Sequence, residues 1–305
     1  MATNQDTKLA NMKTALGVTD GHIQDLEKAW LLSKLSLSSS SLDIATLWGQ
    51  VFDAESVPAG QFNDRMFYYL QTTQGLTGNT IEDLMSSYDW SLFTPASLDN
   101  LEAWYQFNTG ITVTGAGVSQ WDDQSGNDRH LLQGTDTNRP AKETGGEITF
   151  DGVDNFLKVA SFTINQPLTI VVLFKQVTWT STDYIWEFGN GTNAIVLQQY
   201  YSVGEASPDI RMYSGANGPE YRSMTLDTYF SVACVYNGAS SSLSMDGSSV
   251  DTADVGATNG TLFTLGANGP ATNYWTNMQV KDIVITSDAL SAADISNIAS
   301  YHASL

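Results

Sequence analysis

Two carboxylates on one strand can hydrolyse a glycosidic bond, so the spacing of the acidic residues indicates whether this chemistry is possible. A retaining glycosidase holds its two carboxyl groups about 5–5.5 Å apart, and residues two positions apart on a strand share a face. Glu187 has no acidic neighbour at that spacing, and the adjacent Asp122 and Asp123 would point to opposite faces. We therefore expect the protein not to be an enzyme. Inverting and lyase chemistry stay open, because they leave no such local spacing.

A second group of residues could bind a sugar. Sugars need aromatic faces for stacking and amides or charged groups for their hydroxyls. The predicted glycan-binding residues are Trp179, Tyr184, Arg211, Tyr213, Tyr221 and Tyr274. Arg211 and Tyr213 share a face by alternation, and Trp179 and Tyr274 lie in polar segments where their rings can be exposed. About half of the strand aromatics in this region must point into a core instead.

Calcium is the one metal that the sequence suggests, because loop carboxylates are its usual ligands. The candidate ligands are Asp122, Asp123, Asp151 and Asp154. The alternative is that these aspartates form turns and cap neighbouring backbone groups. No other cofactor is expected.

The histidines and the cysteine form no catalytic pattern. His22, His130 and His302 are scattered along the chain, so they match neither a metal site nor a triad. The single cysteine, Cys234, excludes an intrachain disulfide. Its apolar surroundings predict a buried small hydrophobic residue.

Two regions with different periods must position these residues. Residues 1–95 have the period of helices, predicted near residues 9–16, 20–35, 42–52, 65–72 and 80–87. The region is rich in aromatic residues. These residues form either an ordinary small helical core or, in part, a surface that docks on a partner or on copies of the same chain.

After Pro95 short apolar runs alternate with Gly, Asn, Asp and Ser clusters, which predicts strands. Asn237-Gly238 and Asp246-Gly247 are expected to form turns between strands. The predicted strands are residues 102–107, 117–121, 147–150, 156–159, 168–177, 183–188, 194–200, 209–213, 221–225, 229–236, 242–245, 261–265 and 275–286. Only the end differs, where Ser291 caps a predicted helix over Ala292–Tyr301. About a dozen strands without intervening helices predict a β-sandwich or jelly roll.

Composition narrows the classes of partner. Of the 305 residues only 15% are charged, and the net charge is −20. Such an acidic surface repels phosphate backbones and anionic membranes, so we expect neither nucleic acid nor membrane as a partner. The sequence has no apolar run long enough for a membrane span and no signal-peptide pattern, so we expect synthesis in a cytoplasm.

Four short motifs in the second region resemble a known family. They are Trp121-Asp-Asp-Gln-Ser-Gly-Asn127, Phe150-Asp-Gly-Val-Asp154, Leu243-Ser-Met-Asp-Gly247 and Ala289-Leu-Ser-Ala-Ala-Asp-Ile295. Their order is similar to that of the laminin-G-like branch of the concanavalin A-like lectin and glucanase superfamily. The resemblance covers residues 98–305 and implies an antiparallel β-sandwich. Glycosidases of that superfamily carry E-x-D-x-x-E or E-x-D-x-E on one strand, and this sequence carries neither.

The resemblance implies less about function, since the fold hosts lectins, enzymes and adhesion modules. Domains with this opening motif are common in bacteriophage structural proteins and in bacterial surface proteins. We expect a small helical anchoring domain at residues 1–95 and a displayed sandwich at residues 98–305. The expected function is a homo-oligomeric virion structural or decoration protein that attaches through residues 1–95 to other virion proteins and can bind glycans. The alternatives are a carbohydrate-binding adhesion protein of a bacterial surface and a polysaccharide-degrading enzyme.

Overall fold

The computed structural model describes residues 28, 30–32, 34–35, 43–59, 62–73, 93–180, 182–191, 194–200, 208–221 and 224–305. Contacts between residues divide the chain into two compact units, residues 1–93 and residues 94–303. Each unit has a hydrophobic core of its own. In the described part of the chain, no helix is long and apolar enough to cross a membrane.

The first unit is helical where it is described. α3 (Ile44–Ala54) begins after Asp43, whose side chain accepts a hydrogen bond from the Thr46 amide at 2.8 Å. This cap satisfies one of the backbone donors that the first turn of a helix leaves free. α4 (Phe62–Tyr68) continues directly into η1 (Tyr69–Thr73), a short π-helical turn.

Aromatic rings form the core of this helical unit. The centroid of the Trp48 ring lies 5.2 Å from that of Trp30, 5.5 Å from Phe52 and 5.9 Å from Tyr69. The helices predicted at residues 42–52 and 65–72 correspond to α3 and to α4 with η1. Those predicted at residues 9–16 and 80–87 lie outside the described residues.

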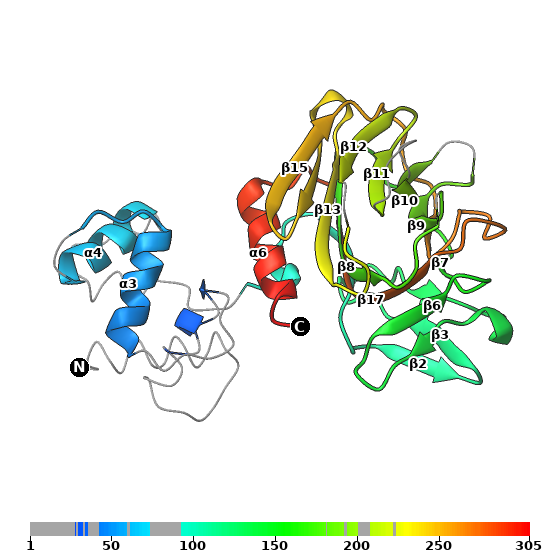
Figure 1. Ribbon diagram of the computed structural model, residues 1–305, viewed down its shortest axis with the longest axis horizontal. Helices are drawn as coiled ribbons and strands as arrows, with labels where there is room; N and C mark the ends of the chain where they lie inside the picture. Colours follow the sequence, from blue (N-terminus) through cyan, green and yellow to red (C-terminus); the bar gives the residue numbers. More distant parts are fainter. Residues whose placement is uncertain are drawn as a thin grey trace. The chain divides into compact units, whose positions relative to one another are not determined.

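The second unit is a jelly-roll-like sandwich of two antiparallel sheets (Figure 1). Sheet A contains β1 (Leu101–Tyr105), β5 (Ala141–Lys142), β6 (Ile148–Asp151), β8 (Leu168–Gln176), β13 (Phe230–Tyr236), β14 (Ser241–Met245), β15 (Ser248–Ala253) and β17 (Asn277–Thr286). Sheet B contains β2 (Ile111–Thr114), β3 (Gly117–Trp121), β4 (Leu131–Leu132), β7 (Leu157–Val159), β9 (Tyr184–Phe188), β10 (Ile195–Tyr200), β11 (Asp209–Tyr213), β12 (Asn217–Tyr221) and β16 (Phe263–Leu265). The prediction of a mainly β sandwich is confirmed.

The strand order follows two paths. Sheet A runs β15-β14-β13-β8-β17-β6-β5, with β1 also paired to β17, and sheet B runs β12-β11-β10-β9-β16-β7-β4-β3-β2. Short 3-10 turns are η2 (Pro95–Ser97), η3 (Asp136–Asn138) and η4 (Gly238–Ser240). The Asp246-Gly247 turn between β14 and β15 is confirmed, because both residues have positive φ, 47° and 83°. A two-residue type I′ hairpin requires that conformation.

The central strands β8 and β13 are buried on both faces. Val172 of β8 and Cys234 of β13 belong to the core between the sheets. Val171 and Val235 are also buried, outside that core, and α6 (Ala292–His302) packs against both strands. A strand covered on both sides needs a continuous apolar run rather than alternation, which explains the sequence of these two strands. The burial predicted for Cys234 is confirmed.

α6 is the helix predicted at the end of the chain. Ser291 and Asp294 form a reciprocal capping box, in which each side chain bonds the backbone of the other. Capping of this kind fixes where a helix begins. The helix extends to His302, one residue beyond the predicted end.

A buried polar cluster ties the end of α6 to sheet A. Asp282 on β17 is fully buried and accepts from the Trp104 indole nitrogen at 3.2 Å and from the Tyr301 hydroxyl at 3.2 Å. His302 Nε2 lies 3.3 Å from Asp282, and His302 Nδ1 lies 2.8 Å from Ser231 Oγ. The contacts from Asp282 through His302 to Ser231 resemble a catalytic triad, but all three side chains are buried. We assign them to packing.

Some strands differ from the prediction. The strand predicted at residues 221–225 is wrong, because β12 ends at Tyr221. The sequence did not predict β12 because Gly218 and Pro219 are unusual within a strand. A proline is tolerated there because β12 is an edge strand. β2, β4, β5 and β15 were missed. β2, β4 and β5 are short. β15 was missed for another reason: its residues are exposed, apart from the half-buried Ala253, so apolar and polar positions do not alternate.

Candidate functional site

Three neighbouring strands of sheet B carry the candidate site on their outer face. The register pairs Gln198 on β10 with Tyr184 on β9 and with Arg211 on β11. Residues paired across adjacent strands lie on the same face. Leu197 and Met212, which alternate with them, belong to the core between the sheets. The three polar and aromatic side chains therefore face away from the core.

Tyr184 and Tyr274 form a stacked aromatic pair at this face. Their ring centroids lie 4.7 Å apart and the ring planes are 14° from parallel. Tyr274 belongs to the loop between β16 and β17 and is 42% exposed. The Tyr184 amide donates to the Tyr274 carbonyl at 2.9 Å. Asn268 Oδ1 holds the loop by accepting from the amides of Thr272 at 2.9 Å and Asn273 at 3.1 Å.

Arg211 adds a positive charge beside the aromatic pair. Its guanidinium carbon lies 3.6 Å from the centre of the Tyr200 ring, within the range of a cation–π interaction. Tyr213, two residues further along β11, shares its face and is half-buried. The face thus combines aromatic rings, an amide and a guanidinium group.

The Tyr184 hydroxyl is a hydrogen-bond donor at neutral pH. Burial is the main cause that raises the pKa of Tyr184 to about 12, and the nearby Glu187, Tyr274 and Tyr213 contribute to this rise. A phenol with such a pKa keeps its proton and can donate to a ligand oxygen.

Trp179 lies at the end of the same strands. The residue is half-buried, and its indole nitrogen donates to the Asp209 carbonyl at the start of β11, at 3.4 Å. The structure therefore brings five of the six residues predicted to bind a sugar around β9, β10 and β11: Trp179, Tyr184, Arg211, Tyr213 and Tyr274. The backbone of the sixth, Tyr221, is in β12, and its side chain lies outside the described part of the chain.

Gln199 is a positioning residue that sequence reasoning missed. It is fully buried, and its Oε1 accepts from the Thr180 amide at 2.6 Å while its Nε2 donates to Thr276 Oγ1 at 2.6 Å. One side chain thus holds both the segment that carries Trp179 and the segment that follows Tyr274. The signal in the sequence is an amide that interrupts the apolar alternation of β10.

Glu187 is the acid beside this face, and its role was also missed. The side chain is fully buried, and Oε1 accepts from the Gly191 amide at 2.6 Å. Its Oε2 has no hydrogen-bond partner within the described residues. A Cβ atom at Gly269 would come 2.6 Å from Oε1, so the covering loop needs glycine there. A buried acceptor without a donor lowers the stability of the fold.

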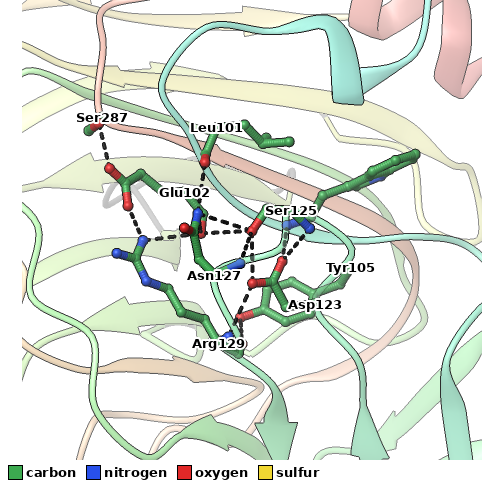
Figure 2. Close-up of polar contacts among 9 residues, drawn as sticks. Leu101, Glu102, Tyr105, Asp123, Ser125, Asn127, Arg129 and Ser287 are labelled. Atoms are coloured by element: carbon green, nitrogen blue, oxygen red, sulfur yellow. Dashed lines mark hydrogen bonds and ion pairs between the residues drawn. The ribbon is translucent and has the colours of Figure 1, made fainter.

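The aspartate-rich loop after β3 has a structural role, shown in Figure 2. Asp123 is buried, and its carboxylate accepts from the amides of Trp104 at 2.9 Å, Ser125 at 2.9 Å and Arg129 at 3.1 Å. Asn127 Nδ2 donates to two carbonyl groups of β1 at 3.0 and 3.1 Å. The motif therefore ties this loop to the first strand of the sandwich.

The four aspartates predicted to bind calcium lie in two loops. Asp122 and Asp123 follow β3, and Asp151 and Asp154 lie at the turn between β6 and β7. Asp151 Oδ1 accepts from the Val153 amide at 2.9 Å, as in a side-chain-stabilised turn. The described residues contain no group of three or more His, Cys, Asp or Glu side chains placed to hold a metal ion. Calcium binding at these residues stays a prediction.

Comparisons with known proteins identify similar folds only. No family model and no curated relative matches the chain. Trypanosoma rangeli sialidase in complex with sialic acid is 14% identical, with a TM-score of 0.49 over 68% of this chain and 33% of the sialidase. Domain 4 of AbnA, a GH43 extracellular arabinanase from Geobacillus stearothermophilus in complex with arabinotriose, is 13% identical, with a TM-score of 0.47 over 66% of this chain and 98% of that domain. A heptameric SAP-like pentraxin from Limulus polyphemus is 16% identical, with a TM-score of 0.41 over 50% of this chain and 81% of the pentraxin.

The prediction that the protein is not an enzyme is corrected by these comparisons. The similar structures include a sialidase, of which the match spans about a third, and a domain of an arabinanase. Proteins named as enzymes are therefore among the structures that this chain resembles. The missing pair does not support a non-enzymatic protein.

Proposed function

We propose that the second unit binds a carbohydrate chain with the outer face of β9, β10 and β11. The stacked pair of Tyr184 and Tyr274, with Arg211 beside it, carries this proposal. The C–H face of a sugar ring packs on an aromatic ring, whose face carries negative partial charge. Tyrosine offers this contact at little cost in side-chain entropy and adds a hydroxyl for hydrogen bonding.

The polar groups of the face complement sugar hydroxyls. Arg211 can donate to them. Gln198 lies between Tyr184 and Arg211 and is buried, with 8% of its surface exposed. The row from Tyr184 through Gln198 to Arg211 crosses two strand spacings, roughly 10 Å. A row of that length favours an oligosaccharide over a single sugar. The tyrosines of this face and Arg211 are at least partly exposed as residues, so a ligand reaches the face without local unfolding.

A glycan array tests this function. The full chain is applied to an array of bacterial and plant oligosaccharides, together with Tyr274→Ala, Arg211→Ala and the control Tyr68→Ala. Tyr68 matches Tyr274 in chemistry and exposure, 39% against 42%, but lies on α4. We expect binding by the wild type and the control, and its loss in the two face variants. Equal signals from all four proteins would refute the proposed face.

The wider setting that we propose is a bacteriophage virion, with a laminin-G-like sandwich displayed and residues 1–95 attached to other virion proteins. The order of the sequence motifs supports it, and so does Phe62, which is 44% exposed on α4. An exposed aromatic residue on a helix suits an assembly contact. Analytical ultracentrifugation of the full chain is expected to show an oligomer that Phe62→Ser dissociates. A monomeric wild type would contradict attachment through copies of this chain.

The alternative setting is a bacterial surface adhesin or a polysaccharide-degrading enzyme. Release of reducing ends from the oligosaccharides that bind on the array would identify the enzyme. Binding without release would favour the adhesin or the virion protein.

A further inference from the structure

A cavity of about 300 Å³ lies at one end of the sandwich, built by elements other than those of the aromatic face. Its lining includes Glu102 on β1, Arg129 in the loop after β3, Thr163 and Asn165 before β8, and Ser287 after β17. We infer that this cavity is a second binding site, which takes one neutral polyhydroxylated ring such as a monosaccharide. The inference does not depend on the aromatic face.

A fixed pair of opposite charges lies in the wall of the cavity (Figure 2). Glu102 pairs with Arg129 and also accepts from Ser287 Oγ at 2.6 Å. Arg129 Nη1 donates to the Glu102 carbonyl at 3.1 Å, and the guanidinium carbon lies 4.0 Å from the centre of the Phe162 ring. Both charged side chains are 24% exposed, so solvent and ligands reach them.

The backbone that carries this pair is also held in place. The Tyr105 hydroxyl donates to the Arg129 carbonyl at 2.6 Å, and the Arg129 amide donates to Asp123 at 3.1 Å. A ligand therefore meets charged groups whose positions are set before it binds. Groups that are ordered in advance lose little entropy on binding.

The opposite wall is fixed independently. Ile164 and Gly260 exchange two backbone hydrogen bonds of 2.9 and 2.8 Å. The Gln166 side chain donates to the Thr258 carbonyl at 2.8 Å and accepts from the Gly238 amide at 2.8 Å. Thr163 and Asn165 stand on this fixed segment and are exposed, and neither side chain has a partner within the described residues.

Unused hydrogen-bonding capacity defines the ligand. The Nε and Nη2 groups of Arg129 have no acceptor among the described residues, and each carboxylate oxygen of Glu102 has room for another donor. An anion would lie beside Glu102 in a chain of net charge −20, and a cation would lie beside Arg129. Adjacent hydroxyls, which donate and accept at once, suit both groups. The volume lies at the low end for small-molecule sites, which limits the ligand to about one ring.

Saturation-transfer NMR on the full chain tests this site. The probes are the methyl glycosides of glucose, galactose and mannose, with glucosamine and inorganic phosphate as cationic and anionic probes. Each probe is titrated into the wild type, Asn165→Trp, Glu102→Gln and Tyr274→Ala. Asn165 is exposed, so a tryptophan there fills the cavity mouth without burying new groups in the fold.

We expect a saturable signal from at least one neutral glycoside. Both cavity variants are also combined with Tyr274→Ala, so that the aromatic face contributes no signal. In that background Asn165→Trp should abolish the remaining signal, and Glu102→Gln should weaken binding about tenfold, since a hydrogen bond to a charged group is lost. A signal that persists in Tyr274→Ala alone separates this site from the aromatic face. Three results would overturn the inference: no saturable signal from any glycoside, tighter binding of phosphate or glucosamine than of every glycoside, or a signal that Asn165→Trp leaves unchanged in the Tyr274→Ala background.

Discussion

Tyr274 stacks on Tyr184 with 4.7 Å between the ring centroids, although the two residues come from distant parts of the chain. The contact joins the loop between β16 and β17 to strand β9. The loop is further tied down by the hydrogen bond from the Tyr184 amide to the Tyr274 carbonyl. The aromatic face therefore depends on loop positions that strands alone do not define.

Replacing Gln199 with leucine should loosen both loops of the face at once. The Thr180 amide and the Thr276 hydroxyl would lose their partner in a buried place. We expect a loss of roughly 2 kcal/mol in the free energy of unfolding, with faster hydrogen exchange in the segments around Trp179 and Tyr274. Exchange that increases equally across the sandwich would contradict a role confined to these loops.

Replacing Asp123 with alanine should destabilise the sandwich by about 3 kcal/mol. The change leaves the amides of Trp104, Ser125 and Arg129 without their acceptor. Urea denaturation measures the loss, with Asp99→Ala as the control at an exposed aspartate outside the predicted calcium ligands. We expect the same loss with calcium and with EDTA. A loss that appears only with calcium would instead support the calcium site predicted from the sequence.

Asp183, next to Tyr184, should make stability depend on pH. Burial raises the pKa of Asp183 from 3.8 to about 6, and a hydrogen bond with the Thr180 side chain opposes part of the rise. The folded state thus holds this proton more tightly than the unfolded chain, so charging Asp183 disfavours folding. The wild type should lose stability relative to Asp183→Asn as the pH rises from about 4 to about 6, and the difference should then stay constant. Thermal unfolding of both proteins across this range measures the difference, and a value independent of pH would disprove the assignment.

Replacing Asp282 with alanine should release the end of α6. The Trp104 indole and the Tyr301 hydroxyl would lose a buried acceptor, and we expect a loss of about 3 kcal/mol or more. Asp294→Ala is the matched control, because it removes only half of the capping box of the same helix and should cost about 1 kcal/mol. Equal losses in calorimetry would show that the buried cluster adds nothing beyond ordinary helix capping.

Strong periodic segments made the sandwich predictable. β8 and β13 were predicted as central strands because their apolar runs are long and unbroken, and both are central in sheet A. β15 was missed because its exposed polar residues leave no pattern. β12 was predicted too late in the chain because Pro219 argues against a strand at residues 217–221. A proline is tolerated in an edge strand, but a single sequence does not reveal which strand lies at an edge.

The candidate site was only partly predictable. Alternation placed Arg211 and Tyr213 on one face, and the register of β10 with β11 then brought Gln198 beside them. The stacking of Tyr184 on Tyr274 and the bridge made by Gln199 depend on the path of loops, which carries no periodic signal. The cavity depends on β1 meeting the end of β17, a contact between the two ends of the domain.

Calorimetric titration tests the central claim most directly. The strongest oligosaccharide from the array is titrated into the wild type, into Tyr184→Ala with Tyr274→Ala, and into the control Tyr68→Ala. We predict that the double variant loses at least about tenfold in affinity, since an aromatic anchor contributes more than 1 kcal/mol, and that the control binds like the wild type. An unchanged affinity in a folded double variant would contradict carbohydrate binding at this face.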